Sequence, residues 1–116
     1  LSTNGSGDGT STDVNATGSG VSVLELYRPT PNPFSNTTSF AYQVSGSASE
    51  RVQIGIYNVA GRLIRELVNE TKAPGRYETV WNGQDQGGSS VTHGVYFIRA
   101  RVGGTVVEST RVLLVP

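Results

Sequence analysis

Few side chains in this sequence of 116 residues could perform acid, base or nucleophilic chemistry. His93 is the one histidine, and there is no cysteine. A Ser–His–Asp triad would have to combine His93 with Asp85 and a nearby serine, and a carboxylate pair for glycoside hydrolysis would be Glu78 with Asp85. A polar turn residue and solvated surface charges explain these side chains better. We therefore expect no catalytic residue, no cofactor and no enzymatic activity.

Oxygen-bearing side chains at two places have spacings that a hard cation could use. The first set has the spacing of an EF-hand start: Asn4, Ser6, Asp8 and Gly9. Asn15 stands where that loop needs a bidentate glutamate. The second set is Asn82 with Asp85 and the carbonyls of their loop, but Asx side chains more often bond their own backbone and shape a turn. We predict no metal site, with calcium at the second loop as an alternative.

Two aromatic residues form a candidate platform for a sugar. The alternation of apolar and polar residues predicts that Tyr57 faces away from the apolar side of its strand, and that Phe97 does the same. Carbohydrate-binding β-sandwiches stack sugars on rings placed in this way. Ordinary core packing explains both rings as well and is the interpretation that we favour.

The chain ends in an apolar segment that is a candidate docking element. Only Arg111 interrupts the apolar character of a last strand that continues through Val112, Leu113, Leu114 and Val115. An unpaired strand edge recruits other strands, and strand addition is a known mode of peptide recognition. This segment must either pair within the domain or be offered to another chain.

These residues need an all-β framework, and the sequence predicts one. Segments with a two-residue period alternate with Gly-, Pro- and Asn-containing turns, and no helical period of useful length occurs. The predicted strands are residues 21–26, 37–44, 51–59, 62–68, 76–81, 94–102 and 105–115. About seven short strands in a chain of this size indicate an immunoglobulin-like antiparallel β-sandwich. Without cysteine, packing of large aromatic side chains must hold the two sheets together.

Composition divides the chain into a linker and one domain. Residues 1–20 have no aromatic, Lys or Arg, and their only apolar side chains are Leu1, Val14 and Ala16. Such a stretch buries too little surface to offset the ordering entropy of roughly 1–2 kcal/mol per residue. We predict a flexible linker at 1–20 and the sandwich at 21–116. The start lacks Met and the features of a signal peptide, so we expect a parent protein N-terminal to residue 1.

The charge pattern restricts the class of partner. The formal net charge is zero, and the nine basic residues are scattered along the sequence. Nucleic acid is therefore not an expected partner. No window approaches the roughly 20 apolar residues that cross a bilayer, so no transmembrane segment is expected.

Four motifs follow one another in a recognisable order. They are Asn32-Pro33-Phe34 before Thr37-Thr38, Tyr57-Asn58-Val59-Ala60-Gly61-Arg62, Trp81-Asn82-Gly83-Gln84-Asp85, and Gly94-Val95-Tyr96. Together they resemble the type A C-terminal sorting domain of proteins exported by the type IX secretion system, and more distantly the Ig-like domain of flagellar hook-capping proteins. The resemblance covers about residues 26–116 and includes the basic residue before a short apolar finish.

The resemblance implies a module that catalyses no reaction. Such a domain lies at the end of a larger secreted protein, commonly a hydrolase or adhesin, and directs its secretion and attachment to the cell surface. Its partners would be the outer-membrane secretion machinery and the cell envelope. The motif residues would be structural: Asn32, Pro33, Phe34, Gly61, Trp81, Gly83, Asp85, Gly94 and Tyr96. The alternatives are a carbohydrate-binding module of a polysaccharide-degrading enzyme, with Tyr57 and Phe97 as its sugar contacts, or a structural Ig-like spacer or hook-capping domain.

Overall fold

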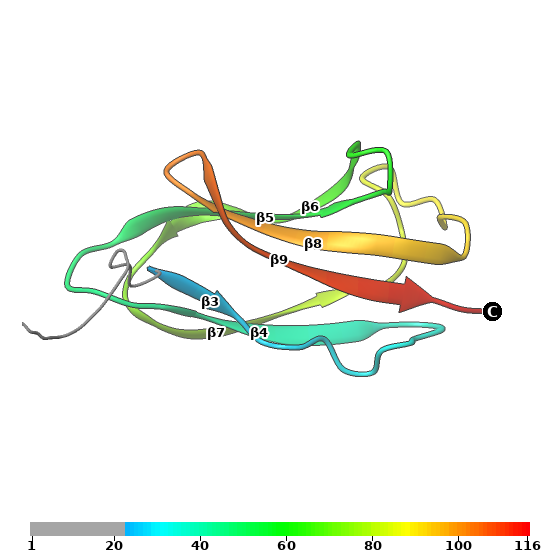
Figure 1. Ribbon diagram of the computed structural model, residues 1–116, viewed down its shortest axis with the longest axis horizontal. Coiled ribbons are helices and arrows are strands. Elements are labelled where there is room, and N and C mark those ends of the chain that lie inside the picture. Colours follow the sequence, from blue (N-terminus) through cyan, green and yellow to red (C-terminus); the bar gives the residue numbers. More distant parts are fainter. Residues whose placement is uncertain (1–22) are drawn as a thin grey trace, which may run out of the picture.

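Two antiparallel sheets lie face to face in the computed structural model, which describes residues 23–116 (Figure 1). Their strands are β3 (Leu24–Leu26), β4 (Thr38–Val44), β5 (Glu50–Tyr57), β6 (Leu63–Lys72), β7 (Gly75–Trp81), β8 (Gly94–Val102) and β9 (Thr105–Leu114). One sheet has the order β3-β4-β7 and the other β6-β5-β8-β9. The predicted all-β, immunoglobulin-like sandwich is confirmed.

Two of the sequence predictions concern residues that the structure does not describe. The predicted linker at 1–20 lies outside the described residues. The side chains with EF-hand spacing lie there as well: Asn4, Ser6, Asp8, Gly9 and Asn15. Within residues 23–116, no helix is long and apolar enough to cross a membrane.

Strand ends differ from prediction where side chains cap the backbone. The predicted strand 51–59 ends at Tyr57 because the Asn58 side chain starts a turn, in which its Oδ1 accepts hydrogen bonds from the backbone N–H groups of Ala60 (3.0 Å) and Arg62 (2.9 Å). Gly61 closes this turn with a φ of 82°, a conformation that favours glycine.

The predicted strand 62–68 is longer in the structure and continues to Lys72. Its last residues are polar, and they pair with β5 as far as Glu50 opposite Lys72. Backbone pairing with a neighbouring strand extends β6 where the hydrophobic pattern has already stopped.

The core lies between the sheets and follows the predicted alternation. Residues facing the opposite sheet are almost completely buried: Phe40, Tyr42 and Val44 on β4, Val52, Ile54 and Ile56 on β5, and Tyr96, Ile98 and Ala100 on β8. Burial of large apolar side chains contributes roughly 1.5–3 kcal/mol each. These contacts hold the sheets together without a covalent bridge.

Three aromatic residues from different motifs form one cluster in this core. The Trp81 ring lies between Phe34, at a centroid distance of 5.4 Å, and Tyr96, at 5.2 Å. Both pairs are inclined, which suits the quadrupoles of the rings. The indole Nε1 donates a hydrogen bond of 2.9 Å to the Gln84 carbonyl, so the same side chain also anchors the loop that follows β7.

Candidate functional site

The terminal strand divides its side chains between the core and the surface. Val112 is 0% exposed and Leu114 is 5% exposed, and both pack in the core. Arg111 lies opposite Phe97 and Leu113 lies opposite Val95 on the neighbouring strand, so both point to the outer face of the four-stranded sheet. Of the predicted docking residues, it is therefore Arg111 and Leu113 that the structure presents outward from β9.

The free edge of this strand is covered by the first motif. Asn32 Oδ1 accepts a hydrogen bond from the Leu113 N–H (2.9 Å), and Asn32 Nδ2 donates to the Arg111 carbonyl (3.1 Å). Phe34 continues the pairing, since its N–H donates to the Leu113 carbonyl (2.9 Å) and its carbonyl accepts from the Val115 N–H (2.8 Å). The strand thus pairs internally on both sides here, which is one of the two outcomes that the sequence left open.

Gly83, in the loop motif, packs against Leu114 at the end of the terminal strand and against Phe34 of the first motif. This glycine is buried with a φ of 74°, and a Cβ on it would lie 3.6 Å from Leu114 Cδ2 and 3.9 Å from Phe34 Cε2. Glycine permits both the backbone conformation and the close approach. Motif residues that are far apart in sequence therefore converge around the end of the terminal strand.

The exposed side chains of this assembly form a shallow surface with a hollow of about 300 Å³. Its lining comes from the first motif, β8 and β9: Asn32, Pro33, Val95, Arg111, Val112 and Leu113. We call this the terminal surface. It combines apolar side chains with the guanidinium of Arg111, a composition suited to a protein partner.

Val95 is a member of the terminal surface that no sequence pattern indicated. It is 36% exposed and lies opposite Leu113. The pairing depends on a register shift between Ala100 and Arg101, where β9 contains one extra residue. No local sequence signal places this bulge.

The two candidate sugar-binding aromatics are adjacent. Tyr57 and Phe97 are cross-strand neighbours on the outer face of the four-stranded sheet, and both are half-buried. The guanidinium carbon of Arg99 lies 4.9 Å from the centroid of the Tyr57 ring. One face of that ring is therefore occupied by a cation, which leaves less of it for a stacked neutral sugar.

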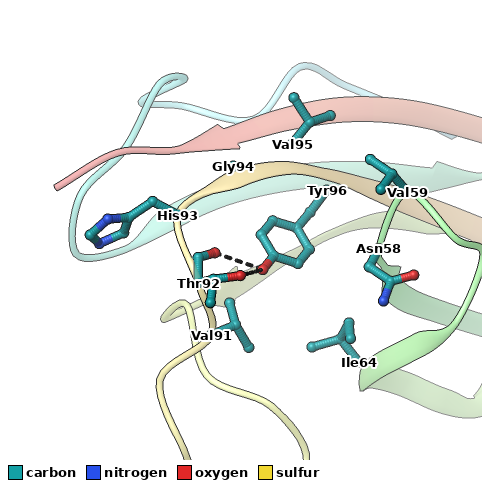
Figure 2. Close-up of a pocket in the computed structure, with 9 residues that line it drawn as sticks. All are labelled: Asn58, Val59, Ile64, Val91, Thr92, His93, Gly94, Val95 and Tyr96. Carbon is teal, nitrogen blue, oxygen red and sulfur yellow. Dashed lines mark hydrogen bonds between the residues drawn. The ribbon is translucent and has the colours of Figure 1, made fainter.

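A pocket of about 390 Å³ lies beside His93, but its lining does not form a catalytic site (Figure 2). Tyr96 Oη donates a hydrogen bond of 2.7 Å to the Thr92 carbonyl. The imidazole of His93 points away from Tyr96 and Ile64 (Figure 2). None of the lining residues is a Ser, Asp or Glu, so the pocket does not combine His93 with the partners that a triad needs.

Asp85 and Asn82 are engaged with their own loop. Asp85 Oδ1 accepts hydrogen bonds from the backbone N–H groups of Gly87 (3.0 Å) and Ser89 (2.9 Å), and Asn82 Oδ1 accepts from Gln84 N–H (3.2 Å). These are the loop-shaping Asx interactions that the sequence favoured over a cation cage. Among the described residues, no three His, Asp or Glu side chains are grouped as a metal site.

Carboxylate-pair chemistry has no geometric support either. Glu78 is exposed on β7, in the three-stranded sheet. Asp85 lies in the loop packed against β6, where its carbonyl accepts a hydrogen bond of 2.8 Å from Arg65 Nη1. Glu78 is not among the residues that line the hollow beside Asp85.

The side chains with shifted pKa values lie away from the terminal surface, near the turn that joins β6 to β7. Burial raises the pKa of Tyr42, and the contact with Glu70 (3.1 Å) raises the pKa of Lys72. Tyr42 stacks on Tyr77 at 5.4 Å. This arrangement is a packed ionic and aromatic contact and does not point to a reactive group.

Comparisons with known proteins agree with this architecture. Among solved structures, dimeric latent PorU from Porphyromonas gingivalis aligns over 83% of this chain with a TM-score of 0.65 and 19% identity. FlgD from Xanthomonas campestris, described as a hook-capping protein essential for flagellar assembly, aligns over 78% with a TM-score of 0.50 and 20% identity. The chain spans 10% of PorU and 64% of that FlgD chain. At these identities the likeness shows the fold.

No curated protein matches the chain in sequence. The family model of the FlgD Ig-like domain does match, over residues 30–105, which is more than half of the 116 residues. The matched region begins just before the first motif and ends at Thr105, the first residue of β9. It contains the loop motif, the aromatic cluster and the glycine that opens β8. This chain belongs to the FlgD Ig-like domain family.

Proposed function

We propose that this Ig-like domain is the non-catalytic C-terminal sorting module of a larger secreted protein, and that it directs type IX secretion and attachment to the cell surface. The observation that carries the proposal is the joining of the first motif to the terminal strand by the hydrogen bonds of Asn32 and Phe34. Two of the sequence features on which the resemblance to sorting domains rests, one early and one at the end, form a single surface.

The terminal surface has the properties of a docking site for protein. Pro33 and Arg111 are exposed and Leu113 is half-buried, while the backbone N–H and carbonyl of Leu113 are bonded to Asn32 and Phe34. A partner would meet a rigid, preformed set of side chains, which lowers the entropic cost of binding. Recognition would therefore use these side chains and not the addition of a new strand at this edge.

The proposed partners are the outer-membrane secretion machinery and, after export, the cell envelope. Residues 21–116 would be the signal-bearing domain, and residues 1–20 would connect it to the parent protein. The location of the mature protein would be extracellular, at the cell surface.

The test is export of a fluorescent cargo fused to residues 21–116 in a cell with a working type IX system. Deleting residues 111–116 is a poor test because it removes Val112 and Leu114 from the core, and we expect the truncated domain to unfold. The double change Arg111→Glu with Leu113→Asp alters only outward side chains. We expect surface fluorescence to fall at least about tenfold, as for the loss of an interface hot spot.

The matched control is Glu78→Arg with Val80→Asp, two exposed positions on β7 in the other sheet. Thermal unfolding of both purified variants should match the unchanged domain, which separates recognition from folding. If the Arg111 and Leu113 variant is exported as well as the control, the proposal is wrong. A fusion that is not exported at all, although folded, would favour a structural Ig-like spacer.

A further inference from the structure

The outer face of the four-stranded sheet gathers arginines that are scattered in the sequence. Val52, Ile54, Ile98 and Ala100 face the core, so the residues between them on β5 and β8 face outward. The outward positions include three arginines beside the aromatic pair: Arg51, Arg99 and Arg101, with Tyr57 and Phe97. We call this set the arginine face.

This face carries an excess of positive charge. In the part of the chain that the structure describes, the ion pair is Lys72 with Glu70, so none of the three arginines of the face is paired with a described carboxylate. Glu66 is the one acid that the register places there, opposite Gly55. Arg51 Nη2 instead donates to the Asn69 side chain (2.6 Å). The whole domain is also more basic than the chain, because all nine Lys and Arg fall within 23–116 while Asp8 and Asp13 precede it.

A hollow lies in the middle of the arginine face. Gly55 forms part of its floor and is covered by its neighbours, since a Cβ on it would lie 2.8 Å from Leu63 Cδ1 and 3.3 Å from Tyr57 Cε1. The hollow has a volume of about 210 Å³ and is lined by side chains of mixed chemistry: Gln53, Ile54, Gly55, Tyr57, Leu63, Glu66 and Arg101. Pockets for drug-sized ligands run from roughly 300 to 1,000 Å³. This one suits a single ring of a larger ligand.

We propose that the arginine face binds a carboxylated polysaccharide, with one uronate ring in the hollow beside Arg101. Arg101 at the wall of the hollow offers a guanidinium fork for the carboxylate. Gln53 can donate or accept and Glu66 accepts, which suits the hydroxyl groups of the same ring. Arg99 and Arg51 continue the positive charge beyond the hollow, where the next acidic units of a polymer would lie.

The chemistry of the face selects this ligand over related ones. A neutral glycan would leave the guanidinium groups without an anion, and the cation over the Tyr57 ring restricts flat stacking. A polyanion without hydroxyl groups would bring its negative charge close to the Glu66 carboxylate. It would also have no hydroxyl group that could donate a hydrogen bond to this carboxylate. Arg111 lies opposite Phe97 on the same outer face, so the terminal surface adjoins the arginine face. Neither Arg111 nor Leu113 lines the hollow, however, so binding there can be tested independently of the sorting proposal.

The test is affinity electrophoresis of the whole chain through gels containing polygalacturonate, fully methyl-esterified polygalacturonate, or poly-glutamate. We expect polygalacturonate to retard the protein, with weaker retardation as salt increases. Esterification keeps the ring and removes the charge, so the esterified polymer should have little effect. Poly-glutamate should also have little effect, since it carries carboxylates without the ring.

Two variants and a control localise the site. Arg101→Gln should weaken binding about tenfold, as expected for the loss of a charge-assisted hydrogen bond. Gly55→Ala should also weaken binding, because its Cβ would lie 2.8 Å from Leu63 Cδ1 and would displace this side chain, which lines the hollow. Arg76→Gln is the matched control, since Arg76 lies over the Tyr27 ring at 4.6 Å in the other sheet, and it should bind like the unchanged chain.

The proposal is overturned if polygalacturonate does not retard the protein, or if the esterified polymer or poly-glutamate retards it equally. Equal loss with Arg76→Gln and Arg101→Gln would also overturn it, since binding would then follow net charge alone. Export of a cargo carrying Arg101→Gln should be unchanged. That readout distinguishes failure here from failure of the sorting proposal.

Discussion

The side-chain carboxamide of Asn32 pairs with the backbone of β9 as a neighbouring strand would. It bonds to Arg111 and Leu113, which lie 79 and 81 positions later in the chain. An amide side chain carries the same donor and acceptor groups as a peptide unit, so it satisfies the edge of β9 without adding a strand. Phe34 extends the same pairing through its own backbone.

Replacing Asn32 by alanine should therefore lower the free energy of unfolding. Both hydrogen bonds are solvent-exposed, so we expect a loss of about 1 kcal/mol. Urea denaturation monitored by Trp81 fluorescence would measure it. Asn36→Ala, at an exposed position in the same connection, is the control and should change stability little; equal effects of the two changes would contradict the role of Asn32.

Tyr42 gives the domain a defined sensitivity to alkaline pH. Burial raises its pKa above the ordinary value of 10.0, and the hydrogen bond to Glu70 raises the pKa of Lys72 above 10.5. In the unfolded chain Tyr42 ionises near its ordinary pKa, so the unfolded state loses its proton first. The stability contributed by the neutral phenol is complete below pH 10 and is lost as the pH rises through the higher folded-state pKa.

Tyr42→Phe tests this directly. The free energy of unfolding of the unchanged protein should fall as the pH rises above about 10, and that of the variant should fall less because it has no phenol to ionise at this position. Chemical denaturation across this pH range would compare them. Parallel pH profiles for the two proteins would show that Tyr42 does not control the alkaline transition.

At the scale of elements, the edges of the larger sheet are covered by segments that are not strands. At β6, the Gln86 N–H donates to the Ile64 carbonyl (2.9 Å), and Gln86 Oε1 accepts from the Glu66 N–H (2.9 Å). At β9 the first motif does the same work. Covered edges prevent association with other strands, so Gln86 protects one edge of the sheet and the first motif protects the other.

Removing the Gln86 side chain should open part of the β6 edge. We expect Gln86→Ala to cost about 1 kcal/mol and to increase self-association at high protein concentration. Light scattering and size-exclusion chromatography would detect this. Gln53→Ala is a matched control, because Gln53 faces outward from a central strand; self-association that is the same in both variants would argue against the edge as its cause.

For the whole molecule, the packed aromatic cluster takes the place that a disulfide holds in antibody domains. Phe34, Trp81 and Tyr96 come from three separate motifs and join the loop, the first connection and β8. A core assembled in this way needs no oxidising compartment in order to fold. The described members of this core all come from the predicted sandwich domain.

The domain should therefore fold without the predicted linker. A chain that starts at residue 21 should unfold in one transition, with a midpoint temperature equal to that of the full chain within about 2 °C. Differential scanning calorimetry of both chains would measure this. A clearly lower midpoint for the shorter chain would mean that residues 1–20 contribute to stability, against the linker prediction.

Local pattern predicts much of the fold. The two-residue alternation of Phe40, Tyr42 and Val44, and of Val52 and Ile56, identifies the inward face of each strand correctly. This works because burial of one face is encoded within a few neighbouring residues. The same pattern does not predict where each strand ends, because hydrogen bonds to side chains such as Asn58 decide where a strand stops.

The terminal strand shows why the candidate site is harder to predict. The Gly103-Gly104 turn alone would continue the pairing of Val102 with Thr105 and place Arg111 opposite Tyr96, toward the core. A bulge between Ala100 and Arg101 shifts the register by one residue, so Val112 takes that place. A shift of one residue exchanges the two faces of a strand.

From its sequence alone, this chain is determined to be an all-β, cysteine-free sandwich with identifiable core positions and ordered motifs, because alternation and turn chemistry act over short distances. Only the tertiary structure decides that Asn32 closes the edge of β9, that Arg111 and Leu113 face outward, and that the dispersed arginines meet around Gly55. These features depend on strand register and on contacts between distant segments. Free energies of packing across the whole sandwich select them, and no local pattern contains that information.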